Sequence, residues 1–473
     1  MSTINSAFNL ISSALQADQS ALNIVSNNVA NANTPGYAQQ VPNWQENTPV
    51  QINGVSYGTG VSETGATSVR DRVLEERLQQ QQQLASASTT HLAALESVQS
   101  LFPPDSGSSS STAGDIGNDI TGFFASFSKL EANPTDNSLR EQVLSTARTL
   151  AGDVSNAAAS LTAQRTSLDQ EGASVTSQVN ALTSAIAQLN MQIQSSSPHA
   201  DAGTLEDQRQ QDLSQLSQLI GVSQITTENN GISLTTPSGE MLVSEGLSYP
   251  LTTGTVNGET RFFVGTSDIT SSLETGGGEL GGYLAARDQD IPRVLSGLDQ
   301  LAYGIATQVN ALNNAGADLS GVTGTATNPL YIFNEPVAAV GSAANLRVVM
   351  TDPSQIAASA AGQGTGDNSN CTALAGLATQ PIANGQTPSD FYSSFVTMLG
   401  STVSQVQIEN AAQNASVTQL QTTRNSLSGV NLNDEASFLQ EFERSYQAAS
   451  QVFTLLNTVM TSALNLGVQT AVS

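Results

Sequence analysis

Both ends of this chain carry an apolar repeat with alternating spacings of four and three residues, the pattern of a helix that packs along a seam. At the N-terminal end, seven of the eight seam positions are apolar and Asp18 is the exception. The apolar positions are Ile4, Phe8, Ile11, Leu15, Leu22, Val25 and Val29. The helix should end before Asn33-Thr34-Pro35-Gly36-Tyr37, because proline disfavours a helical Thr34 and Pro-Gly fits the centre of a type II turn.

The C-terminal end repeats this pattern from residue 432 onward, with Glu435 as its polar member. Asn431 or Asn433 can cap the new helix, and Gly429 can end the one before it. The large apolar positions are Leu432, Leu439, Phe442, Tyr446, Phe453, Leu456 and Met460. Isolated helices of this length are marginal in water, so each stripe needs a partner. We interpret the large seam residues of both ends as an assembly interface, although two amphipathic helices in one globular core would give the same periodicity.

The charge balance argues against several classes of partner. The formal net charge is −26, and Lys129 is the only lysine among 14 basic residues. Nucleic acid and anionic membrane surfaces attract clustered Lys and Arg, so neither is an expected partner. No run approaches the roughly 20 apolar residues of a membrane span. The N-terminus lacks a basic segment followed by a continuous apolar one, so we expect no cleaved signal peptide.

Between the ends, the periodicity predicts a mainly α chain with β-rich insertions. Residues 70–222 read as helical, whereas residues 224–272 alternate with a period of two. Asn257-Gly258 separates two apolar runs and favours a hairpin with a type I′ turn. Pro292 should kink the next long helix or mark its start. The expected segments are an N-terminal coiled-coil helix (1–34), a mainly helical middle domain (35–223), a β-rich segment (224–272), a returning helix (273–316), an outer irregular or β region (317–387), a middle-domain helix (388–430) and a C-terminal coiled-coil helix (431–473).

No combination of residues predicts a catalytic, cofactor-binding or metal site. Gly54-Val55-Ser56-Tyr57-Gly58 matches a nucleophile elbow, but further glycines follow it where a helix is needed, so a β-hairpin-like loop is the better interpretation. Gly276 through Gly281 matches a dinucleotide fingerprint without a core strand before it. The two histidines, His91 and His199, have no Cys-rich cluster and are expected at the surface. Cys371 has no histidine near it in sequence, and a buried small residue is its expected role.

The residues at the two ends resemble a known group of proteins. The segment Ala21 through Tyr37 looks like the N-terminal signature of flagellar rod, hook and hook-associated proteins, and Tyr446-Gln447-Ala448-Ala449 resembles the paired C-terminal signature. Gly36-Tyr37, followed by Gln39-Gln40, is closer to the hook-associated protein 1 family at the hook–filament junction than to rod or hook proteins. Ser428 through Ala436 is the most specific match in the rest of the chain, although this family usually has Asp where this chain has Asn433.

This resemblance implies a structural subunit with an inner coiled coil, a helical middle domain and an outer domain, and no enzymatic activity. It implies a helical homo-oligomer that meets the hook protein on one side and a second junction protein on the filament side. It also implies export through the flagellar secretion channel to the cell exterior, and a chaperone that covers the C-terminal helix. A hook or rod subunit is the alternative within the same machine, and a secreted hydrolase with flagellar-type ends is a more distant one.

Overall fold

The computed structural model describes residues 2–52, 54–103, 115–196, 202–227 and 230–469. Two compact units form: residues 1–85, 176–278 and 413–473 make unit 1, and residues 86–175 and 279–412 make unit 2. The division falls inside the expected 35–223 segment, because the long helices α2 (Arg72–Gln99) and α4 (Asn137–Ser196) contribute to both units. The fold is mainly helical with small β-sheets, as the periodicity predicts.

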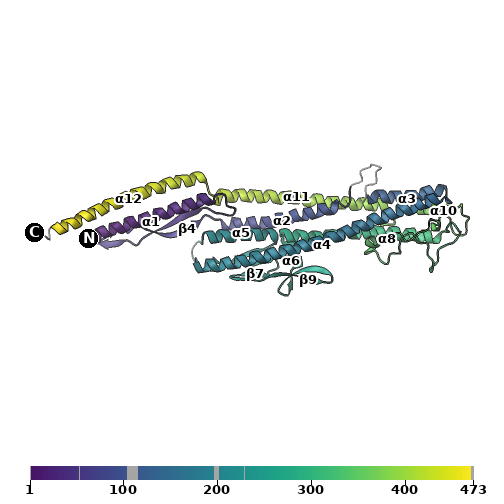
Figure 1. The fold of residues 1–473 in the computed structure, drawn as a ribbon, viewed down its shortest axis with the longest axis horizontal. Helices are drawn as coiled ribbons and strands as arrows, with labels where there is room; N and C mark the ends of the chain where they lie inside the picture. Colours follow the sequence, from purple (N-terminus) through teal and green to yellow (C-terminus); the bar gives the residue numbers. More distant parts are fainter. Residues whose placement is uncertain (1, 53, 104–114, 197–201, 228–229, 470–473) are drawn as a thin grey trace. The chain divides into compact units, whose positions relative to one another are not determined.

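Unit 1 contains the paired chain ends. Helix α1 (Ser2–Asn31) packs along α12 (Leu432–Gln469), so the two outermost segments of the sequence lie side by side (Figure 1). The predicted type II turn follows α1: Tyr37 N donates to Thr34 O at 3.2 Å, and Gly36 has a φ of 84°. Asn431 begins α12, since its carbonyl accepts from Glu435 N at 3.0 Å.

A β-ribbon follows the turn and forms the start of the 35–223 segment. Strand β1 (Gln40–Glu46) pairs antiparallel with β4 (Val61–Ser68), and β2 (Val50–Ile52) pairs with β3 (Val55–Tyr57) between them. Both β1 and β4 contact α1. Helix was expected only from about residue 70, and the β2–β3 hairpin agrees with the β-hairpin-like loop expected at residues 54–58, whereas the pairing of β1 with β4 was not predicted.

Two further sheets of unit 1 are fastened to α4 by asparagines. The four-stranded sheet contains β5 (Ser223–Thr226), β6 (Ile232–Thr235), β7 (Met241–Ser244) and β8 (Leu247–Ser248); the three-stranded one contains β9 (Leu251–Val256), β10 (Glu259–Val264) and β11 (Ser267–Asp268). Asn190 Nδ2 donates to Ile232 O at 2.8 Å, and Asn180 bonds both backbone groups of Leu251. Asn257 and Gly258 have φ values of 53° and 83°, which confirms the predicted type I′ turn between β9 and β10.

Further helices complete the secondary structure of units 1 and 2. Unit 1 also contains α5 (Thr204–Leu219) and α6 (Thr270–Gly276), and α11 (Pro388–Ser428) contributes to both units. Helix α7 (Gly278–Ala285) starts at the boundary and continues through a π-helical turn (Ala286–Asp290) into α8 (Ile291–Ala315). Pro292 therefore marks the start of α8, one of the two outcomes expected for it. No helix among the described residues is long and apolar enough to cross a membrane.

The core of unit 2 is built around α3 (Ile116–Ala132), which contributes Phe123, Phe124 and Phe127. Phe123 meets Phe333 with ring centroids 5.5 Å apart. Residues 317–387, all described, form short helices at Ser342–Asn345, Pro353–Gln355, Ser369–Gly376 (α10) and Leu377–Thr379, joined by isolated β-bridges. The short strands expected there are absent, because asparagines of α8 hold this backbone instead: Asn310 Oδ1 accepts from the amides of Ile332 and Phe333 at 3.0 Å.

Unit 2 contains a carboxyl pair with a testable pH dependence. Burial, a hydrogen bond with Asp153 and repulsion from Asp153 and Asp115 raise the pKa of Asp119 to about 7 from 3.8. A raised folded-state pKa means that the stabilisation is fully present below the unfolded-state pKa and is lost as pH rises towards 7. After a discount for partial exposure, we expect the α3–α4 contact to be about 1–2 kcal/mol less stable at pH 8 than at pH 4.

Asp119→Asn should remove most of this dependence. Hydrogen exchange of the peptide that spans α3, measured between pH 4 and 8 after correction for the intrinsic pH dependence of exchange, checks this expectation. Glu96→Gln removes an exposed carboxylate from the same unit and serves as the control. An equal pH dependence in wild type and Asp119→Asn would contradict the assignment to this pair.

Candidate assembly site at the base of the terminal helix pair

A buried asparagine joins α1, the β-ribbon and α12. Asn28 is 1 % exposed, and its amide makes four hydrogen bonds. Its Nδ2 donates to Gln40 O at 2.8 Å and to Glu435 Oε1 at 3.1 Å, while its Oδ1 accepts from Tyr37 OH at 2.7 Å and Gln40 N at 3.0 Å. This set uses both donors and both acceptor positions of the side chain, so no other residue type can replace it without loss.

Glu435 and Tyr37 complete this base cluster, which we define as Asn28, Tyr37, Gln39, Gln40 and Glu435. Glu435 is 1 % exposed, and its Oε1 also accepts from Gln39 Nε2 at 2.7 Å. Burial raises the pKa of Tyr37 to about 12, and the carboxylates of Asp207 and Glu435 add to the shift. The phenol therefore stays protonated and donates to Asn28. Glu435, the polar exception in the C-terminal stripe, is a bonding residue of the cluster.

The end of α11 also forms hydrogen bonds with the segments around the base cluster. Arg424 Nε donates to Glu75 Oε1 at 2.9 Å, and its Nη2 donates to the carbonyl of Tyr37 at 2.9 Å. Ser428 O accepts from Gln39 N, and Ser428 Oγ donates to Val69 O, both at 2.9 Å. The segments that resemble the flagellar signatures, residues 21–37 and 428–436, therefore meet in one polar network.

The interface residues expected from the sequence fall into three groups. Ile4 lies in α1, but its side chain is outside the described residues. A second group is buried or half-buried on the paired faces, with Phe8 and Phe453 in edge contact at 4.8 Å. It consists of Phe8, Ile11, Leu15, Leu22, Val25, Leu439, Phe442, Phe453, Leu456 and Met460. The remaining three, Val29, Leu432 and Tyr446, are exposed.

A second apolar face of α12 was missed by the sequence interpretation. Leu455 is 64 % exposed, and Phe438, Val452 and Val459 are also exposed. We call these four residues the outer face of α12. Val452, Leu455 and Val459 follow a spacing of three and four that is a weaker copy of the main stripe, and this spacing was the available signal.

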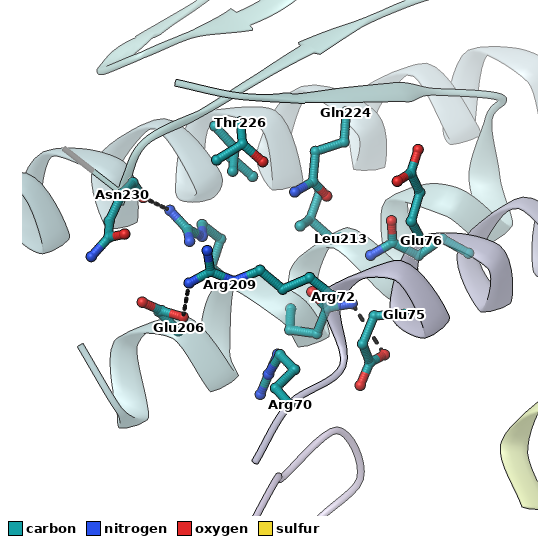
Figure 2. Close-up of a pocket in the computed structure, with 13 residues that line it drawn as sticks. Arg70, Arg72, Glu75, Glu76, Glu206, Arg209, Leu213, Gln224, Thr226 and Asn230 are labelled. Carbon is teal, nitrogen blue, oxygen red and sulfur yellow. Dashed lines mark hydrogen bonds and ion pairs between the residues drawn. The ribbon is translucent and has the colours of Figure 1, made fainter. Parts of the chain in front are cut away.

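A polar cleft beside the base cluster collects charged residues of α2 and α5. Figure 2 shows the side chains of Arg72 and Arg209 directed towards Glu206 and Asn230, and Arg209 donates to Asn230 O at 2.6 Å. Burial and repulsion from Arg72 and Arg70 lower the pKa of Arg209 to about 10, although Glu206 opposes the shift. These arginines and carboxylates lie close enough to neutralise one another, so the cleft fastens α2 to α5 and has no excess charge for a ligand.

The motifs weighed for chemistry have structural roles. Ser56 lies in the exposed strand β3 of a hairpin, which confirms the β-hairpin-like interpretation. Gly278 is needed for close packing, because a Cβ there would lie 2.5 Å from Ile220 N.

The surface expectation for His91 is wrong: it is partly buried, and its Nε2 lies 2.6 Å from Asp290 Oδ2. His199 is outside the described residues. Cys371 is fully buried, and burial raises its pKa to about 12.

Comparison with known proteins supports the resemblance of the two ends and extends it over the whole chain. The model of the flagellar hook-associated protein FlgK helical domain matches residues 106–327, and the flagella basal body rod protein model matches residues 8–37. Flagellar hook-associated protein 1 of Escherichia coli (strain K12) is 25 % identical, covering 98 % of this chain and 100 % of the relative. The same protein of Bacillus subtilis (strain 168) is 26 % identical over 96 % of each chain.

A solved structure shows the same fold. The flagellar hook junction protein FlgK from Burkholderia pseudomallei superposes with a TM-score of 0.66 at 20 % identity, covering 75 % of this chain and 100 % of that one. The rod-type match is confined to the N-terminal segment that contains Asn28 and Tyr37, whereas the hook-associated match covers the helical body. Over nearly its whole length, the chain is therefore similar to flagellar hook-associated protein 1 of these organisms.

Proposed function

We propose that this chain is a structural subunit of the bacterial flagellum that assembles at the hook–filament junction through its paired terminal helices. The observation that carries the proposal is the outer face of α12. Phe438, Val452, Leu455 and Val459 remain exposed after α1 and α12 have packed together. Each large apolar residue that becomes fully buried contributes about 1.5–3 kcal/mol, so the face favours association once a partner covers it.

The chain thus offers two kinds of apolar surface at its ends. The main stripe, which includes Phe8 and Phe453, packs α1 against α12 within one subunit and is only half-buried there. The outer face of α12 has no counterpart within the described residues and is suited to neighbouring copies in a helical homo-oligomer. Both surfaces take part in assembly. The main stripe holds α1 and α12 of one subunit together, and the outer face of α12 contacts the helix pair of a neighbouring subunit.

The family implies the partners of such a subunit. The relatives are named hook-associated or hook junction proteins, so we expect the hook protein below and a second junction protein on the filament side. An exposed apolar helix face promotes aggregation, and a chaperone that covers α12 before assembly would prevent this. We expect export through the flagellar secretion channel to the exterior, without a cleaved signal peptide.

The alternatives account for less of the chain. A rod or hook subunit would share the match at residues 8–37, but the hook-associated helical domain matches residues 106–327. A hydrolase built on Ser56 would need a nucleophile on a sharp turn between a buried strand and a helix. Ser56 instead lies within an exposed hairpin strand.

A truncated chain that lacks residues 1–33 and 431–473 tests the proposal. We expect this variant to be monomeric and to retain the unit 2 core, which uses no residue of either end. It should fail to restore filament attachment and motility in a strain without the native subunit, because both apolar surfaces are gone. Motility in soft agar and fluorescence microscopy of labelled filaments are the measurements.

The full chain with the same label should restore motility and give one focus where hook and filament meet. Restored motility by the truncated variant would count against the assembly role. Labelling distributed along the hook, or confined to the rod, would instead support the alternative subunit.

A further inference from the structure

The hairpin at the tip of the β-ribbon has one apolar face and one polar face. Its register pairs Val50 with Tyr57 and Gln51 with Ser56, and directly opposite residues of an antiparallel pair lie on the same face. Val55 shares the face of Tyr57, because side chains alternate along a strand. Val50, Val55 and Tyr57 are 49 %, 53 % and 51 % exposed, and Gln51 and Ser56 are exposed as well. Neither face of the hairpin is therefore buried by the described part of the subunit.

Such a hairpin needs a further surface to pack on. A two-stranded hairpin alone is at best marginally stable in water, and its apolar face normally packs on a further strand or a helix. In this chain, β1 and β4 contact α1, while the apolar side chains of β2 and β3 remain exposed beyond them. We call Val50, Val55 and Tyr57 the hairpin face. This face is suited to a helix of another molecule, and tyrosine is among the residue types enriched where protein surfaces associate.

The hairpin lies at the end of the helix pair that is far from the base cluster. The β-ribbon begins beside Asn28, which bonds the first residue of β1. It then runs along α1 as far as Gly60, where a Cβ would lie 3.1 Å from Leu10 Cδ1. Phe8, two residues before Leu10, contacts Phe453 of α12. Because Phe453 lies within the exposed series of α12, the hairpin face and the outer face of α12 lie at the same end of the pair.

These two surfaces also occupy uncharged parts of a strongly acidic chain. The net charge is −26, so copies of the chain repel one another over most of their surfaces. Residues 47–61 contain no charged side chain, and residues 445–473 contain none either. The second range includes Val452, Leu455 and Val459 of the outer face. Since like charges that face each other oppose association, an uncharged hairpin and an uncharged helix face can meet without this penalty.

We propose that the hairpin face of one subunit packs on the outer face of α12 of the next subunit. This inference rests on the proposed function, because a helical homo-oligomer requires a heterologous contact between two different surfaces of each copy. A contact of the outer face with itself would be isologous and would close a dimer. The hairpin supplies the second surface, so each copy covers Val452, Leu455 and Val459 of its neighbour.

Disulfide cross-linking in intact flagella tests this contact. A disulfide forms where two Cα atoms lie roughly 4.4–6.8 Å apart, so it reports direct packing. Tyr57→Cys is combined in turn with Val452→Cys, Leu455→Cys and Val459→Cys, and at least one pairing should give disulfide-linked ladders after mild oxidation. Ser56→Cys, on the polar face of the hairpin, is the matched control and should give at least fivefold less product with the same three partners.

Chains with a single introduced cysteine show which surfaces meet. A Tyr57→Cys chain and a chain with the partner cysteine, expressed together, should form dimers without longer ladders, because each copy then offers one thiol. Neither chain should cross-link when it is expressed alone, since the native Cys371 is buried. Dimers of Leu455→Cys alone would show an isologous contact and would overturn the proposal. The absence of ladders in all three pairings, or equal ladders with Ser56→Cys, would also overturn it.

A second measurement decides the question if the cysteine variants do not assemble. Val50→Ser with Val55→Ser should lower the amount of chain recovered with purified flagella at least fivefold, because the hairpin face is lost. Gln51→Ala with Ser56→Ala changes only the polar face and should leave this amount unchanged. Equal recovery of the two double variants would overturn the proposal. If wild-type label remains where hook and filament meet but no Tyr57 pairing cross-links, the hairpin contact is rejected and the proposed function stands.

Discussion

Leu439→Asp combined with Phe453→Asp should abolish incorporation of the chain into the flagellum. Both residues are half-buried on the α1-facing side of α12, and Phe453 touches Phe8. Each substitution removes part of the about 1.5–3 kcal/mol that a fully buried side chain of this size contributes, and adds a carboxylate to a seam that already contains Asp18. The sum exceeds what two marginal helices can tolerate, so the pair should separate. Motility and the amount of chain recovered with purified flagella measure the loss.

Unit 2 provides the internal reference for this variant. Its core is formed by residues of 86–175 and 279–412, so exchange protection of the unit 2 peptides should not change. The control is Gln440→Asp with Gln451→Asp, which adds the same two charges at exposed positions of α12 and should retain most of the incorporation. Normal motility of the Leu439/Phe453 variant would contradict the role of the seam. A large loss of protection in unit 2 would mean that α12 belongs to the ordinary core.

Asn28→Asp should release the base of the terminal pair with a single isosteric change. The new carboxylate loses both donors, which now reach Gln40 O and Glu435 Oε1, and it faces the Glu435 carboxylate. Loss of buried hydrogen bonds together with two facing carboxylates destabilises the helix pair by about 3–5 kcal/mol. Amide hydrogen exchange in α1 and α12 should therefore become more than a hundredfold faster. Hydrogen exchange of the free chain and motility of the variant strain give the two readouts.

A second substitution makes this prediction specific. Glu435→Gln in the Asn28→Asp background should restore part of the protection, because the new amide can donate to the carboxylate introduced in α1 while Gln40 O stays without its donor. Asn27→Asp adds the same charge at the exposed neighbouring position and should have little effect. No rescue by Glu435→Gln, or an equal effect of Asn27→Asp, would show that the four bonds of Asn28 do not determine stability at this site.

The terminal helices were predictable because their repeats are long and strongly periodic. The type II turn at Gly36, the cap at Asn431 and the type I′ turn at Asn257 followed from residues with narrow conformational preferences. The outer face of α12 was not found, because Val452, Leu455 and Val459 form a shorter series than the main stripe. Periodicity shows that a face is apolar, but it does not identify which face an internal partner will cover.

The base cluster could not be predicted from the sequence, because its contacts join residues that lie far apart along the chain. Asn28 and Glu435 are separated by 407 positions in the sequence. In the sequence, Glu435 was only the polar exception in the apolar repeat of the C-terminal helix. The pairing of β1 with β4 was missed, although the hairpin around Gly54 was expected, because the ribbon packs against α1 and no local pattern shows that contact. The strands expected in residues 317–387 were not formed, since side chains of α8 such as Asn310 satisfy the backbone there without a sheet.

Thiol labelling of the outer face of α12 tests the central claim most directly. A Leu455→Cys chain should react rapidly with a maleimide when free and at least tenfold more slowly within intact flagella, because neighbouring copies cover the face. Ala449→Cys, on the half-buried side of α12, should react slowly in both states, and the native Cys371 is buried and contributes little background. Equally rapid labelling of Leu455→Cys in the free chain and in assembled flagella would contradict the claim that this face joins one subunit to the next.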